Sequence, residues 1–150
     1  MHYKILTLEK KDDWSGLLRL FSDDQQDIYY TPNYYDIFEK NGTGKAMCFV
    51  YKQKSGVAIY PFIKNSINNL GYDLDDEYFD IQGAYGYNGI LSSNYNNIFR
   101  NNFYKEFYEY CQKGNIIAEF NRYNPMLNNH MFADGILDLE LNRKTIYLDL

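Results

Sequence analysis

The chain is 150 residues long, which is about the length of one ordinary domain and enough to bury a sizeable core. Hydrophobic residues make up 45% of it and aromatic residues 19%, and these fractions argue against an intrinsically disordered chain. The formal net charge of -5 argues against a nucleic-acid surface or an anionic-membrane surface, because such partners favour a basic face.

The sequence indicates neither a targeting segment nor metal or disulfide chemistry. Its first residues lack the basic start and apolar centre of a secretory signal, and no apolar run approaches the roughly 20 residues that span a bilayer. We therefore expect a cytoplasmic protein without a transmembrane segment. Cys48 and Cys111 each stand alone inside an apolar pattern, which favours buried free thiols over a disulfide or a metal site. His2 and His130 have no partners at ligand spacing, so no metal site is predicted.

The first half of the chain predicts a strand, two helices and a hairpin. Residues 3–8 alternate apolar and polar side chains, as a half-buried strand does. Residues 12–21 carry apolar side chains at helical spacing behind two aspartates, and residues 31–42 open with a Thr-Pro helix start and close with Asn-Gly. Residues 45–52 and 57–63 are strand-like runs on either side of a turn signal, which predicts a hairpin.

The second half predicts a strand, a long helix and further strands. The polar segment 66–77 indicates a loop, and its acidic run lacks the glycine and the distal glutamate of a calcium loop, so a solvated turn is expected. Residues 98–111 carry a helical apolar pattern that Gly114-Asn115 ends. The expected strands are residues 78–81, 116–120, 136–141 and 145–150, and residues 122–132 form an irregular segment.

Three glycines and two tyrosines follow the strand-like run 78–81, within the segment 80–89. Glycine lets the backbone approach a ligand or another chain segment closely, and tyrosine offers a flat surface with a hydrogen-bonding tip. The pattern predicts a binding loop in which Tyr85, Tyr87 and Asn88 hydrogen-bond to a ligand and stack on it. A packed turn that fills the gap between strand and helix explains the same residues, and both interpretations remain open.

A second loop begins where the strand-like run 116–120 ends, and it carries Glu119, Arg122 and a proline. If the two strands are parallel neighbours joined through the long helix, their two loops face one cleft. Glu119 is a candidate general base for that cleft, which would require a raised pKa and contact with the acceptor proton. The alternative is that Glu119 and Arg122 form a structural ion pair or orient loop carbonyls.

The order of elements resembles the acyltransferase fold of the GNAT superfamily. The segments 78–89, 116–129 and 144–150 look like the N-terminal lobe of GNAT-like proteins related to the Fem family of peptidoglycan interpeptide-bridge aminoacyltransferases. This resemblance implies an α/β (α+β) fold of three layers, with a mixed central sheet flanked by helices. It further implies that residues 1–150 form a single GNAT-like domain, the first lobe of a longer tandem-lobe protein. The implied activity is transfer of an acyl or aminoacyl group to an amine or hydroxyl in cell-envelope biosynthesis.

The resemblance places acceptor binding in this lobe and the donor mainly in the second. In the GNAT phosphate loop, closely spaced backbone amides lead directly into a helix, whereas here the glycines fall 1, 4 and 7 positions after Gln82 and the helix begins later. We therefore expect an acyl-CoA or aminoacyl donor to bind mainly to a second lobe. Asn124 stands where relatives often have histidine. The expected substrate-binding residues are Gln82, Tyr85, Tyr87, Asn88, Arg122 and Asn124.

The sequence is compatible with two functions. The first is an acyltransferase lobe whose acceptor is a small molecule or a cell-envelope precursor, and the second is a non-catalytic binding or lobe-docking module. The segment 144–150 ends in an apolar alternation, which predicts an open edge strand that pairs with a second GNAT-like lobe or, in a homo-oligomer, with another copy of the chain. A second GNAT-like half encoded downstream of Leu150 would favour the first function.

Overall fold

The structure is a computed structural model that describes residues 2–142, 144 and 146. Within these residues the chain forms one six-stranded sheet and three α-helices. The helices are α1 (Lys11–Leu18), α2 (Pro32–Lys40) and α3 (Asn97–Lys113). The strands are β1 (Tyr3–Thr7), β2 (Lys45–Gln53), β3 (Gly56–Ser66), β4 (Phe79–Gln82), β5 (Leu91–Ser92) and β6 (Ile116–Phe120).

The sheet is mixed, with the strand order β1-β2-β3-β4-β6 and with β5 paired to β3 outside this path. The pairs β1–β2, β2–β3 and β3–β4 are antiparallel. Strands β4 and β6 are parallel, because α3 carries the chain back between them and so lets both run in the same direction. The predicted side-by-side, parallel arrangement of these two strands is confirmed.

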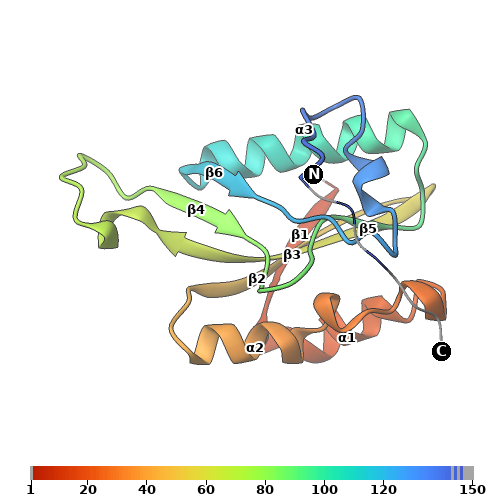
Figure 1. The fold of residues 1–150 in the computed structure, drawn as a ribbon, viewed down its shortest axis with the longest axis horizontal. Coiled ribbons are helices and arrows are strands. Elements are labelled where there is room, and N and C mark those ends of the chain that lie inside the picture. The colour runs from red at the N-terminus through yellow and green to blue at the C-terminus, as the bar shows by residue number, and fades with distance from the viewer. Residues whose placement is uncertain (1, 143, 145, 147–150) are drawn as a thin grey trace.

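The sheet separates two layers of helices. Figure 1 shows α3 on one face and α1 with α2 on the other. Each face has its own apolar core, and the fully buried Trp14 and Tyr35 belong to the α1–α2 side, whereas the fully buried Phe103 belongs to the α3 side. Strand β3 contributes to both, since its consecutive residues Ile59 and Tyr60 enter opposite cores. The mixed α/β class with a central sheet flanked by helices is thereby confirmed.

Local signals place the helix starts where the sequence predicts them. The Thr31 hydroxyl accepts a hydrogen bond from the Tyr34 amide at 3.3 Å, and Pro32 occupies the first helical turn of α2. The Asn96 side chain caps α3 in the same way, through the Ile98 amide at 2.9 Å. Helix α1 is shorter than expected and ends at Leu18, although Phe21 beyond it still packs into the core.

The strands of the structure differ from the predicted strands in two places. Strand β5 was not predicted, since two residues are too short to show an alternation. The predicted strand 136–141 is wrong, because these residues form a turn followed by irregular chain, without strand pairing in the described part of the chain. The amides of Ile136 and Leu137 both bond back to the Ala133 carbonyl, and Leu141 is 83% exposed. Apolar alternation alone therefore does not produce a strand where no neighbouring strand is available. Most of the predicted strand 145–150 lies outside the described residues.

Several smaller expectations also meet the structure. Both cysteines are free thiols in the structure; Cys48 is buried, as predicted, whereas Cys111 is only half-buried. The acidic run 73–77 is exposed, as a solvated turn requires. Of the helices in the described part of the chain, none combines the length and apolar character needed to span a bilayer.

Candidate functional site

The two loops singled out in the sequence lie together at the carboxyl ends of β4 and β6. Gln82, the last residue of β4, is paired with Phe120, the last residue of β6. Beyond the strands the contact continues, because the Asn88 amide donates a hydrogen bond to the Arg122 carbonyl at 2.7 Å. We call residues 83–89 the tyrosine loop and residues 121–125 the Arg122 loop, and the expectation that these two loops are neighbours is confirmed.

A cleft of about 260 Å³ opens beside these loops. It is lined by the end of α2 and the turn that follows, by the loop after β4, and by Phe120 and Arg122 at the end of β6. The lining includes both strand-end side chains Gln82 and Phe120, the rim tyrosine Tyr85, and Arg122. Ligands of open α/β sheets commonly bind at such carboxyl ends of parallel strands, so this cleft is the leading candidate site.

Among the residues that the structure describes, Arg122 is the only charged one that lines the cleft. Its guanidinium carbon lies 6.0 Å from the centre of the Phe120 ring, a distance at which a cation is attracted to an aromatic face. Tyr85 is 78% exposed and Phe120 60% exposed, so two large aromatic side chains border the cleft with much of their surface in solvent. The cleft thus combines a positive charge with flat apolar surface.

The structure brings four of the six expected substrate-binding residues to this cleft and leaves two elsewhere. Gln82, Tyr85, Asn88 and Arg122 line it. Tyr87 instead packs edge-on against Tyr29, with 5.7 Å between ring centres. Asn124 is buried, and its amide group donates to Asp27 Oδ2 at 3.0 Å. These two side chains therefore hold the surrounding loops together.

The glycines of the tyrosine loop allow other residues of the chain to pack closely against the loop. Gly86 has φ +103 and Gly89 has φ +106, both in the region that favours glycine. A Cβ atom on Gly86 would lie 2.3 Å from the Tyr29 ring, and one on Gly89 would lie 2.6 Å from Asn129 Nδ2 and 2.7 Å from the Tyr123 ring. The inner side of the loop is thus a packed turn, while its outer side lines the cleft.

The buried Asn88 and Asn129 and the half-buried Asn121 fix the position of this loop. The Asn88 side chain accepts a hydrogen bond from the Tyr35 hydroxyl at 3.3 Å and donates one to Asn121 Oδ1 at 3.2 Å. Asn129 Nδ2 donates to the Asn88 carbonyl at 2.7 Å and to the Tyr30 hydroxyl at 2.7 Å. Sequence reasoning missed Asn121 and Asn129, since nothing local distinguishes them from the many other asparagines of the chain.

Glu119 does not line the cleft, because a β-bulge turns its side chain to the opposite face of the sheet. Phe79 pairs with Ile116 and Asp80 with Ala118, so one extra residue stands in β6. The bulge puts Ile116 and Glu119 on the α3 face, and Phe120 on the α2 face that the cleft occupies. A role for Glu119 as the general base for an acceptor in this cleft stays a prediction. The position of its side chain on the α3 face argues against that role.

The Glu119 carboxylate is bound by neutral partners. Its Oε1 atom accepts a hydrogen bond from the Tyr60 hydroxyl at 2.6 Å and another from the Asn121 amide group. No salt bridge joins Glu119 to Arg122, so the ion-pair alternative is wrong. Although much of the Glu119 side chain is exposed, burial of the carboxylate raises its pKa, and the two hydrogen bonds oppose that effect.

Replacing Glu119 with glutamine is expected to change how stability depends on pH. The raised pKa means that the folded chain holds this proton more tightly than the unfolded chain does. The stability contributed by Glu119 is therefore present below the ordinary pKa of 4.5 and is lost as pH rises through the folded-state pKa. Glutamine keeps an oxygen acceptor for Tyr60, so E119Q should gain stability relative to wild type as pH rises from about 4 to about 7.

Thermal unfolding at several pH values measures this difference. The exposed Glu140 provides the matched control, since E140Q also replaces one carboxylate, but one that accepts no hydrogen bond from a buried tyrosine. A stability difference between E119Q and wild type that does not change with pH would contradict the prediction.

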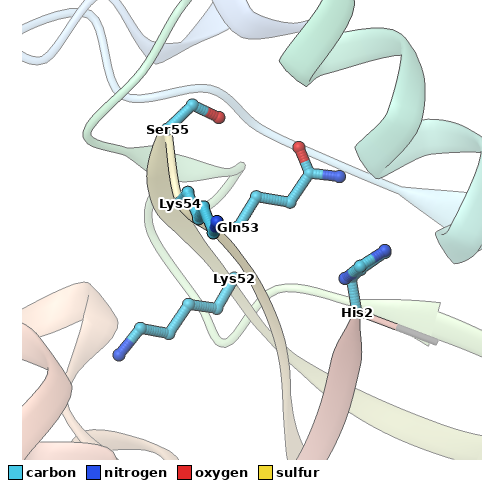
Figure 2. Close-up of a pocket in the computed structure, with 5 residues that line it drawn as sticks. All are labelled: His2, Lys52, Gln53, Lys54 and Ser55. Atoms are coloured by element: carbon cyan, nitrogen blue, oxygen red, sulfur yellow. The ribbon is translucent and has the colours of Figure 1, made fainter.

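A second, larger hollow of about 610 Å³ lies beside the turn between β2 and β3. It is lined by His2 and residues 52–55, and four of these five residues are exposed. Figure 2 shows the Lys52 side chain extending away from His2, so the polar groups do not converge on one point. The smaller cleft at the β4 and β6 ends is therefore the better candidate.

Comparisons of the chain with known proteins found no relative. No family model, no curated protein and no solved structure matches the chain. The residues of the cleft and their geometry are therefore what bears on function.

Proposed function

We propose that this chain is the acceptor-binding lobe of a GNAT-like acyl- or aminoacyltransferase, and that the acceptor occupies the cleft at the ends of β4 and β6. The observation that carries the proposal is the meeting of Gln82, Tyr85 and Arg122 around one cavity beside two adjacent parallel strands. An amide, a phenol and a guanidinium can together orient a polar molecule by hydrogen bonds. The acceptor would present its amine or hydroxyl to a donor held outside this cleft.

The cleft suits an acceptor better than an acyl-CoA donor. Its volume of about 260 Å³ is below the usual range for a drug-sized ligand, about 300 to 1,000 Å³, so it fits one end group of a larger molecule. The α3 N-terminus offers no ready phosphate site either, because the Asn96 side chain already caps it. An acyl-CoA or aminoacyl donor would then bind mainly to a second lobe.

Calorimetric titration of the chain with acetyl-CoA is expected to give no binding tighter than about 100 micromolar. The reason is the absence of a glycine loop that leads directly into a helix, since β4 and α3 are separated by 14 residues that include β5. A low-micromolar dissociation constant would place the donor in this lobe and contradict the division of roles.

The acceptor half of the proposal is tested by nuclear magnetic resonance. The ¹⁵N-labelled chain is titrated with a soluble peptidoglycan precursor peptide, and the amide signals of residues 82–89 and 120–123 are followed. We expect these signals to shift together, and R122Q to weaken binding while R19Q does not. Arg19 is exposed, lies outside the cleft lining and carries the same charge, so R19Q is the matched control. Shifts confined to other surfaces would refute acceptor binding in the cleft.

A non-catalytic docking module is the second candidate function. It is favoured by strand β6, which is the last strand of the described sheet and leaves Ile117 63% and Phe120 60% exposed. An edge strand with exposed apolar side chains is suited to pairing with another strand. Binding of an isolated second lobe without any effect of R122Q, together with no response to the precursor peptide, would favour this function.

A further inference from the structure

The charge distribution around the cleft favours an anionic ligand. Arg122 is exposed, and no other described residue of the lining is charged. Acidic side chains on the neighbouring elements are engaged elsewhere, since Glu39 accepts from the Ala46 amide at 2.6 Å and Asp80 accepts from Asn65 at 2.8 Å. No described carboxylate therefore forms a salt bridge with the Arg122 guanidinium. A guanidinium without such a partner is well suited to a carboxylate or a phosphate.

The aromatic side chains add a second element of recognition. Phe120 lies beside Arg122, and Tyr85 reaches the rim from the facing loop. Large aromatic side chains with 60% and 78% exposure present flat surface on which a ring or a peptide plane can stack. The Tyr85 backbone, by contrast, is held in place, because its carbonyl accepts a hydrogen bond from the Tyr34 hydroxyl at 2.7 Å. The loop is thus held in place while its tyrosine ring remains free to contact a ligand.

We infer that the cleft selects a small organic anion, in which a carboxylate or phosphate that pairs with Arg122 stands next to a flat group that stacks on Phe120 and Tyr85. This inference rests on the proposed function only in taking the cleft as the ligand site, and it names the chemical class of the acceptor end group. The Gln82 amide, which also lines the cleft, would supply a further hydrogen bond to a polar atom between the anion and the flat group.

Three probes on the full 150-residue chain test this inference. N-acetylphenylalanine carries a carboxylate beside a ring, N-acetylphenylalaninamide is its neutral counterpart, and phenyl phosphate carries the alternative anion. We expect the carboxylate to bind about tenfold more tightly than the amide in ¹⁵N titrations, as a charge-assisted pair predicts. The shifted amides should include Gln82, Tyr85 and Arg122. Whichever anion binds more tightly identifies the preferred group.

Two substitutions make the test specific. R122Q should bring the affinity for the carboxylate down to that for the amide, whereas R19Q should leave the difference unchanged. Both replaced residues are exposed, so neither change is expected to unfold the chain, and a thermal melt checks this. Replacing Tyr85 with leucine should weaken both ring-bearing probes alike, since it removes a stacking surface and no charge.

The outcomes separate this inference from the proposed function. The anion inference would be overturned if the chain bound the acid and its amide equally tightly, or if R122Q left the affinity for the acid unchanged. Acceptor binding would still be judged separately, by the precursor-peptide titration. Absence of any shift at the cleft with all three probes would also overturn it. A response to the probes without any response to the precursor peptide would support the anion inference and count against the proposed acceptor.

Discussion

Replacing Asn129 with alanine is expected to lower the free energy of unfolding by about 3 kcal/mol. Its side chain is fully buried and forms hydrogen bonds with three residues. It donates to the Tyr30 hydroxyl and to the Asn88 carbonyl, both at 2.7 Å, and it accepts from the Asn124 amide at 2.8 Å. Alanine would leave these partners buried without a bond, and each such group costs about 1 to 3 kcal/mol less any relaxation.

Denaturant unfolding of N129A, compared with N101A, measures the effect. Asn101 is exposed on α3, so its replacement should stay within about 0.5 kcal/mol of wild type. The N129A variant should also broaden or shift the amide signals of residues 84–89, because the Asn88 carbonyl loses its partner. A loss below about 1 kcal/mol would show that this hydrogen-bond network does not hold the tyrosine loop.

Replacing Gly89 with alanine is expected to destabilise the chain by about 3 kcal/mol or more. The residue has φ +106, which an alanine adopts only under strain. The added methyl group would also lie 2.6 Å from Asn129 Nδ2 and 2.7 Å from the Tyr123 ring, well inside van der Waals contact. Both effects act at the junction of the tyrosine loop and the Arg122 loop, so we expect ligand binding at the cleft to fall as well.

Replacing a second glycine, Gly42, separates the effect of backbone strain from the effect of steric crowding. Gly42 also has a positive φ, +79, but nothing lies within 4 Å of the site of its missing Cβ. Its replacement by alanine should therefore cost only about 1 kcal/mol. Adding N129A to G89A should cost less than N129A alone, because it removes one of the two crowded groups. Equal losses in G89A and G42A would mean that the close packing seen at Gly89 is unimportant.

Much of the candidate site could be predicted from local sequence, but its detailed composition could not. The glycine and tyrosine pattern after one strand, and the Arg122 loop after another, correctly indicated two loops around one cleft. The contribution of Phe120 was missed, because an aromatic residue at the end of an apolar run looks like a core residue. Its 60% exposure follows from the position of β6 at the end of the described sheet.

Sequence by itself determined the elements whose signals are local. Alternation in residues 3–8, the Thr31-Pro32 start of α2 and the turn between β2 and β3 each depend on neighbouring residues, and each appears in the structure as expected. The parallel pairing of β4 and β6 also followed, because a long helix between two strands favours a crossover that makes them parallel.

Only the tertiary structure decided which side chains share the cleft. The bulge in β6 adds one residue and so reverses the alternation of side chains, which places Phe120 in the cleft and Glu119 on the opposite face. Pairing with a neighbouring strand likewise decides whether an apolar alternation becomes a strand, and within the described part of the chain residues 136–141 pair with no strand. Both outcomes depend on contacts between segments far apart in the chain, which no local pattern encodes.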